Sequence, residues 1–172
     1  MMHYPRIPMI AAFAITYSFT TSSMLPAYAQ DAASTAFAQK AAQSDMFEIE
    51  AAKVAIARGK DDAAKRFARD MVMDHTKSST DLKSAVEAEK IELPTGLTQE
   101  NTDKLAALEA ASDVDFDQAY LATQVAAHEE AVAMFTSYVK DGPDGPIKNF
   151  ATATLGTLRT HAIKVHGLTD NK

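Results

Sequence analysis

Four side chains that can bind a transition metal are spread along the sequence: Glu48, His75, His128 and His161. Each one lies in a segment where apolar residues recur at spacings of three and four, as on one face of a helix. A carboxylate or imidazole on such a face costs free energy to bury unless something pairs with it. One carboxylate and three imidazoles that meet inside a protein would suit a single transition metal ion: Zn, Fe, Cu or Mn.

Four further polar residues lie close to these candidates in the sequence: Asp74, Asp117, Tyr120 and Gln124. The first adjoins a histidine, and the other three precede another histidine on the same expected helix. A metal-bound imidazole usually donates its second nitrogen to a nearby acceptor. These four residues are therefore candidates for fixing the orientation of the histidine rings.

The same cluster has a second interpretation that needs no metal. A histidine on an apolar helix face is often a hydrogen-bonded core residue, and Glu48 could form an ion pair with one of the imidazoles. A buried polar layer of this kind can set the register between helices. The sequence leaves both interpretations open.

The segments that would position these residues are four long helices, expected at about 34–58, 61–90, 112–141 and 146–167. Ser34 is a candidate N-cap for the first helix, and Gly167 a stop for the last. Short loops join the first helix to the second and the third to the fourth, so each pair forms an antiparallel hairpin.

A longer link, residues 91–111, joins the two hairpins and contains a short helix that Thr98 can cap. This link can span the full length of a bundle, as the single crossover of ferritin-like folds does. An up-down-up-down bundle is the alternative if the short helix only covers one end. We predict an all-α, ferritin-like four-helix bundle with a long crossover between helices two and three.

Composition limits the possible functions of the chain. Its 172 residues suffice for one domain, and it contains no cysteine, which excludes disulfides, thiolate metal sites and cysteine nucleophiles. The net charge of −6 argues against nucleic acid as a partner. No nucleophile motif or glycine-rich phosphate loop is present, so we do not expect a hydrolase or a nucleotide-binding enzyme.

Residues 1–29 have the pattern of a secretory signal peptide. Arg6 precedes an apolar run over residues 9–19, and Ala27-Tyr28-Ala29 offers a cleavage sequence. We expect cleavage after Ala29, a mature domain of residues 30–172, and a periplasmic location.

Several stretches resemble, in order and spacing, the bacterial exported family described as domain of unknown function 4142. The matching pieces are FAQKAAQSDMFE at 37–48, FARDMVMDH at 67–75, FDQAY at 116–120, QVAAHE at 124–129 and LGTLRTH at 155–161. The resemblance implies a ferritin-like bundle in the periplasm, with some relatives labelled outer-membrane proteins, and it supplies no reaction. Its signature positions would be Glu48, Asp74, His75, Asp117, Tyr120, Gln124, His128 and His161.

One departure separates the chain from ferritin-like di-iron proteins, which place a glutamate three residues before a histidine. Here those positions hold Val72, Val125 and Leu158. The sequence therefore argues against a carboxylate-bridged di-iron or iron-storage centre. The leading hypothesis, which rests on the four candidate residues, is one metal ion in the middle of the bundle, serving metal handling or envelope stress protection. The alternative is a metal-free structural or interaction module with a protein partner in the cell envelope. A redox enzyme with Tyr120 beside the metal is a third hypothesis.

Overall fold

The structure is a computed structural model that describes residues 1–2 and 25–170, with side chains described for residues 1–2 and 32–170. Most of the predicted signal peptide, residues 3–24, lies outside the described residues. The described part is all-α, with no strand. Its helices are α1 (Leu25–Arg58), α2 (Asp62–Glu87), α3 (Gln99–Ala110), α4 (Phe116–Asp141) and α5 (Pro146–Asp170). None of these helices is long and apolar enough to cross a membrane.

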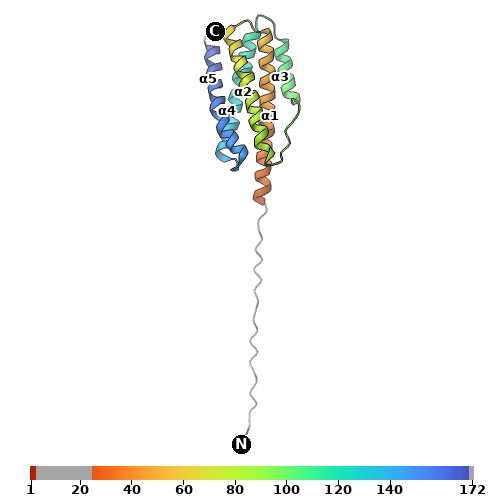
Figure 1. Ribbon diagram of the computed structural model, residues 1–172, viewed down its shortest axis with the longest axis vertical. Coiled ribbons are helices and arrows are strands. Elements are labelled where there is room, and N and C mark those ends of the chain that lie inside the picture. Colours follow the sequence, from red (N-terminus) through yellow and green to blue (C-terminus); the bar gives the residue numbers. More distant parts are fainter. Residues whose placement is uncertain (3–24, 171–172) are drawn as a thin grey trace.

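Four long helices form a bundle, and the short α3 lies outside it (Figure 1). The hairpin partners α1 and α2 pack together, as do α4 and α5, while α2 packs on α5 and α1 on α4. Helix α3 packs against α1 and α4. The predicted four-helix bundle with an extra short helix is therefore confirmed.

The link between α2 and α4 is a crossover along the whole bundle (Figure 1). It leaves α2 beside the α4–α5 turn, where the Glu89 carboxylate lies close to Gly145. It arrives at the opposite end, where Arg58 at the end of α1 donates to the carbonyl of Ala111 at 2.7 Å. Helices α2 and α4 consequently run parallel, which is the ferritin-like arrangement and excludes the up-down-up-down alternative.

Local signals account for several helix ends. Asp61 caps α2, because its Oδ1 accepts from the backbone N–H groups of Ala63 and Ala64 at 2.7 and 2.9 Å. Thr98 caps α3 by accepting from the N–H of Asn101, as predicted.

Three predicted helix ends are wrong. Helix α1 begins at Leu25, so Ser34 is not a cap but a buried residue whose hydroxyl shares a 2.9 Å hydrogen bond with that of Tyr138. Helix α4 begins at Phe116, after a turn in which Ser112 bonds Asp115 at 2.6 Å. Helix α5 continues through Gly167 to Asp170. Tertiary contacts extend a helix beyond its local stop signals when packing favours it.

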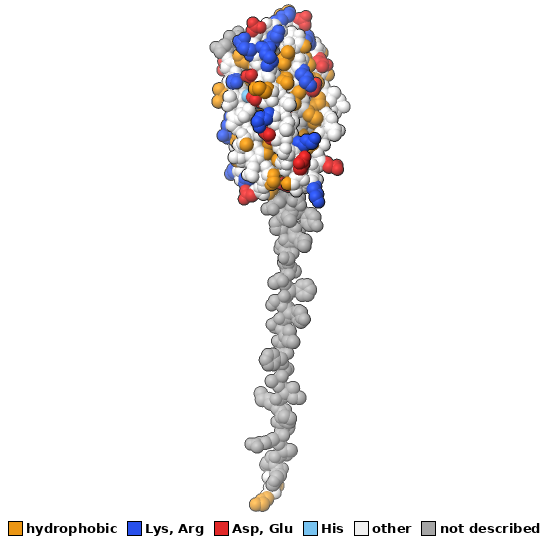
Figure 2. Space-filling model, in the orientation of Figure 1, with side chains coloured by type: hydrophobic (Ala, Val, Ile, Leu, Met, Phe, Trp, Pro, Cys, Tyr) orange, Lys and Arg blue, Asp and Glu red, His pale blue; other side chains and the backbone are white. Residues whose placement is uncertain are grey.

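The core consists of two apolar clusters separated by a polar layer. One cluster surrounds Phe37, Leu82 and Phe135, and the other surrounds Phe67, Met71 and Leu121. The outer surface carries acidic and basic side chains interspersed with apolar ones on the face that Figure 2 shows. The polar layer between the clusters contains the candidate residues.

Candidate metal centre

Each long helix contributes one of the four candidate residues to the polar layer. Glu48 lies on α1, His75 on α2, His128 on α4 and His161 on α5. All four side chains are buried, with residue exposures of 1–2%. Such burial of four titratable groups requires partners inside the protein.

The three imidazoles face one another across the bundle axis. Their ring centroids lie 5.7 Å apart for His75 and His128, 5.7 Å for His75 and His161, and 5.3 Å for His128 and His161. One nitrogen from each ring lies within 4.8 Å of the other two. This spacing lets the three rings share one ion.

The outward nitrogen of each ring has an acceptor. His75 Nδ1 donates to Asp45 Oδ1 at 2.8 Å, and His161 Nε2 donates to Asp74 Oδ2 at 2.9 Å. His128 Nδ1 donates to the backbone carbonyl of Gln124 at 2.9 Å. These acceptors define the tautomer of each neutral ring, because a carboxylate or carbonyl oxygen can only accept.

The other nitrogen of each ring is buried without a hydrogen-bond partner among the described residues. These atoms are His75 Nε2, His128 Nε2 and His161 Nδ1. In the neutral rings each carries a lone pair. An imidazole that donates one nitrogen to an acceptor and directs the other lone pair inward has the arrangement of a metal ligand.

The protonation of the rings differs with their surroundings. Burial, together with the nearby His75, lowers the pKa of His128 to about 3. Burial also lowers the pKa of His161. At His75 burial acts in the same direction, but the hydrogen bond to Asp45 and the charge of Glu48 outweigh it and raise the pKa. Burial thus favours the neutral, ligating form of His128, whereas the carboxylates around His75 favour its protonated form, with which a metal ion would compete.

Glu48 occupies a different place from the one that the sequence predicted. Its Oε2 accepts from Gln124 Nε2 at 2.6 Å, and its Oε1 lies 3.9 Å from the outward nitrogen of His128. The carboxylate is thus beside the histidine cluster and outside the group of three converging nitrogens. Burial raises the pKa of this carboxyl group.

The other predicted neighbours fall into two groups. Asp74 and Gln124 contact the cluster as described, and Tyr120 is fully buried in the adjoining apolar cluster around Phe67, with its hydroxyl unpartnered among the described residues. Asp117 lies at the end of the bundle instead. Its carboxylate accepts from the backbone N–H groups of Lys60 and Asp61 at 3.1 and 2.9 Å, so it holds the α1–α2 turn.

Asp45 is the functional candidate that sequence reasoning missed. It is 5% exposed and holds His75 through the hydrogen bond already described. A signal was available, because Asp45 precedes Glu48 by three residues and therefore lies on the same helix face. The sequence pattern did not single out Asp45, because this residue lies at the edge of the alanine-rich apolar face of α1.

Apolar side chains close one side of the centre. The ring of Phe67 lies 6.2 Å from that of His128 and 6.3 Å from that of His161, both edge to face. Met71, on the next turn of the same helix, is fully buried. These walls exclude water and strengthen the electrostatic interactions inside.

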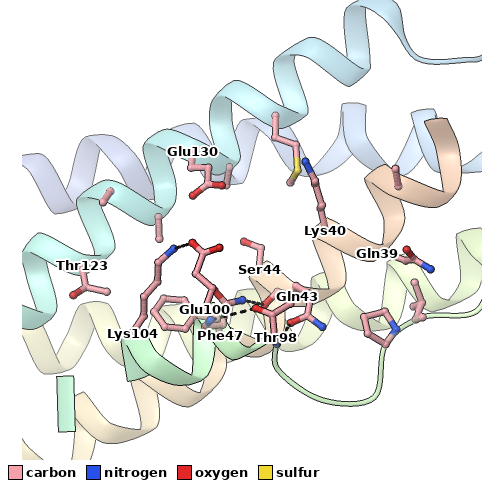
Figure 3. Close-up of a pocket in the computed structure, with 18 of the residues that line it drawn as sticks. Gln39, Lys40, Gln43, Ser44, Phe47, Thr98, Glu100, Lys104, Thr123 and Glu130 are labelled. Atoms are coloured by element: carbon pink, nitrogen blue, oxygen red, sulfur yellow. Dashed lines mark hydrogen bonds and ion pairs between the residues drawn. The ribbon is translucent and has the colours of Figure 1, made fainter. Parts of the chain in front are cut away.

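A separate groove of about 990 Å³ lies between α1, α3 and α4 (Figure 3). Its walls include Phe47, Lys40 and Glu130, and Glu100 pairs with Lys104 across one side at 2.7 Å. None of the three histidines lines this groove, and none of its lining side chains has a buried, unpartnered polar atom. The groove is therefore distinct from the candidate metal centre.

Fold and site together define an all-α bundle with a ferritin-like crossover and a buried cluster of three histidines. The sequence profile of the family described as "Domain of unknown function (DUF4142)" matches residues 20–168, and the chain belongs to this family. No curated protein matches the sequence.

The bundle is also similar to a solved structure, the crystal structure of a DUF305 fragment from Deinococcus radiodurans. The TM-score is 0.71 at 14% sequence identity, and the match covers 81% of this chain and 97% of that chain. At this identity the similarity supports the fold alone.

Proposed function

We propose that this protein binds one transition metal ion through His75, His128 and His161. The observation that carries the proposal is the shared hydrogen-bond pattern of the three rings. In each ring one nitrogen is bonded to an acceptor and the other is buried without a partner among the described residues, and one nitrogen of each ring lies within 4.8 Å of the other two. A dication among the three lone pairs would satisfy all of them at once.

The donor set favours a borderline first-row metal over calcium or magnesium. Imidazole nitrogen suits Zn, Cu and Fe, whereas the hard alkaline-earth cations require oxygen ligands. Ligand nitrogens around a tetrahedral ion are about 3.3 Å apart at a bond length of about 2.05 Å. The rings, whose nearest nitrogens now lie at most 4.8 Å apart, would have to move closer together to reach that geometry.

The surrounding carboxylates support a cation in this layer. Asp45 and Asp74 bond two of the rings, and Glu48 lies beside the third. Negative charge on the buried Asp45 and the partly buried Asp74 offsets part of the cost of placing a dication in a low-dielectric interior. These carboxylates also increase the basicity of the imidazoles to which they are bonded.

The proposed role is metal handling in the cell envelope. Export to the periplasm rests on the signal-peptide pattern of residues 1–29, and a link to envelope stress or to the outer membrane is part of the same proposal. A centre of three neutral ligands suits the binding and release of an ion. We infer no reaction for it.

Elemental analysis of the purified chain tests the proposal. The full sequence is expressed with its own N-terminal segment, exported and purified without a polyhistidine tag. We expect about one equivalent of a single transition metal per chain, by the one-site geometry. The His75→Ala and His128→Ala variants should lose the metal and keep their helical circular dichroism, whereas His166→Ala, at an exposed histidine, should keep it.

The alternative is a metal-free polar layer that sets the register of the helices. The Glu48–Gln124 hydrogen bond and the Asp45–His75 pair favour it, because both are satisfied within the chain. The three ring nitrogens for which the described part of the chain provides no partner argue against it, since buried polar atoms rarely lack partners. Wild-type protein without metal, and without a thermal shift on adding Zn, Fe, Mn or Cu, would establish this alternative.

A further inference from the structure

A small pocket between α2 and α5 connects the surface with the histidine cluster. Its volume is about 240 Å³. Two of the three histidines, His75 and His161, form part of its wall. The remaining lining residues come from the same two helices: Asp74, Lys77, Ser78, Asp81, Ala153, Thr154, Thr157 and Leu158.

The polar groups of the pocket form a path from solvent inward. The side chain of Asp81 is 49% exposed, that of Asp74 is 31% exposed, and His161, to which Asp74 is bonded, is buried. Acidic groups at a mouth attract cations and raise their local concentration. Asp81 pairs with Lys77. The lining contains two carboxylates, Asp74 and Asp81, and one lysine, Lys77, so its charge is negative when the histidines are neutral.

A buried hydroxyl marks the inner part of the same pocket. Ser78 lies one helical turn beyond His75, is 8% exposed, and its Oγ has no hydrogen-bond partner among the described residues. A hydroxyl in this position can bond a water molecule carried by an incoming ion. The Ser78 hydroxyl is therefore a polar group of the pocket that is independent of the carboxylates at its mouth.

Other described side chains around the cluster are closely packed. Phe67 and Met71 close one side of the cluster, and the groove of Figure 3 meets none of the three histidines. The packed alanines Ala51, Ala55 and Ala68 leave the α1–α2 contact closed, with exposures of 0–1%.

We propose that the α2–α5 pocket is the entrance through which a hydrated divalent cation reaches the three histidines. Asp81 and Asp74 attract the ion, Ser78 bonds one of its water molecules, and Asp74 positions His161 to receive it. The inference rests on the proposed metal binding, and it assigns to this pocket the control of metal exchange.

Binding kinetics with a plugged pocket test the entrance. Ala153 on α5 is exposed and lines the pocket. Ala126 on α4 is also exposed, and it lines the separate groove between α1, α3 and α4. Stopped-flow absorption with Co²⁺ as the only metal reports association, and transfer to a chelator reports dissociation. We expect Ala153→Phe to slow both rates about tenfold, a barrier increase of about 1.4 kcal/mol, with an unchanged dissociation constant. Ala126→Phe should match wild type.

The possible outcomes separate the two proposals. If Ala153→Phe binds Co²⁺ with wild-type rates, the entrance is elsewhere and the metal centre stands. If wild-type protein binds no Co²⁺ and purifies without metal, the centre itself is wrong. Asp81→Asn provides a second readout, because the loss of a mouth charge should slow association at low ionic strength and leave dissociation unchanged.

Discussion

At the scale of single residues, the acceptors behind the histidines are as informative as the histidines themselves. Two carboxylates and one backbone carbonyl determine which nitrogen of each ring faces the centre. A side-chain acceptor can be changed without removing a ligand. This makes Asp45 and Asp74 the sharpest positions at which to test the proposed centre.

We predict that Asp45→Asn and Asp74→Asn each weaken metal binding about 10–100-fold. The expected loss arises because the amide holds the ring less firmly and lowers its basicity. Competition against a chromophoric chelator measures the dissociation constant. Asp70→Asn is the matched control, since Asp70 lies one turn before Asp74 on α2 but is exposed and pairs with Lys164. Equal affinities in all three variants would contradict the assignment.

The buried imidazoles also predict how the stability of the metal-free protein depends on pH. Burial lowers the pKa of His128 in the folded state to about 3 from an ordinary value of 6.5, so the folded protein keeps this ring neutral over that pH range. The unfolded chain therefore binds more protons between these values, so acidification lowers the free energy of unfolding by up to about 1.4 kcal/mol per pH unit.

His161, with its lowered pKa, acts in the same direction as His128. His75 opposes it, because a raised pKa stabilises the fold at low pH and loses that contribution as the pH rises. Urea unfolding in chelator at about pH 7 and about pH 5 measures the difference. His128→Gln, which removes the titrating group, should flatten the dependence, and an unchanged slope would contradict the role of burial.

At the scale of elements, Asp117 shows that one residue can organise the meeting of three helices. It lies in the first turn of α4, and its carboxylate accepts from the backbone of the α1–α2 turn. Arg58 completes this end of the bundle by donating to the carbonyls at the end of the crossover helix α3. The crossover is thereby attached where α4 starts.

We predict that Asp117→Ala lowers the free energy of unfolding by about 1–3 kcal/mol, because two backbone donors lose a charged acceptor. Metal affinity should stay at the wild-type value, since the turn lies far from the histidine layer along the bundle. Denaturant unfolding and the chelator competition measure the two quantities. Asp113→Ala, at an exposed partner of Arg58, should change stability less.

At the scale of the whole molecule, the histidine layer joins all four long helices. His75, His128 and His161 come from α2, α4 and α5, and Asp45 and Glu48 attach α1 to the same layer. An ion held there would connect both hairpins, in addition to the Glu48–Gln124 and Asp74–His161 hydrogen bonds that already join them. Metal binding is therefore expected to stabilise the fold as a unit.

We predict that metal at about 100 times its dissociation constant raises the free energy of unfolding by about 2.7 kcal/mol. Thermal unfolding with metal and with chelator measures the shift. The His75→Ala variant should show none, while His166→Ala should show the full shift. A shift of equal size in His75→Ala would place the bound metal at another site.

Much of this architecture could be predicted because it depends on local and additive properties. Helical periodicity along residues such as Phe67, Met71 and His75 identifies an amphipathic helix without knowledge of its neighbours. Loop length likewise separates hairpins from a crossover, since a chain segment of known length has a maximum reach. The bundle, the short extra helix and the burial of all four candidate residues follow from such properties.

Only the tertiary structure decided how the polar residues are paired. Asp45 and Glu48 lie one turn apart on the same face of α1, and the rotation of α1 against α2 and α4 determines that one holds His75 while the other meets Gln124. Asp117 was expected beside His128 because both are on α4, yet it lies at the end of the bundle. Sequence spacing determines which side chains share a helix face, whereas packing between helices determines which partner each one meets.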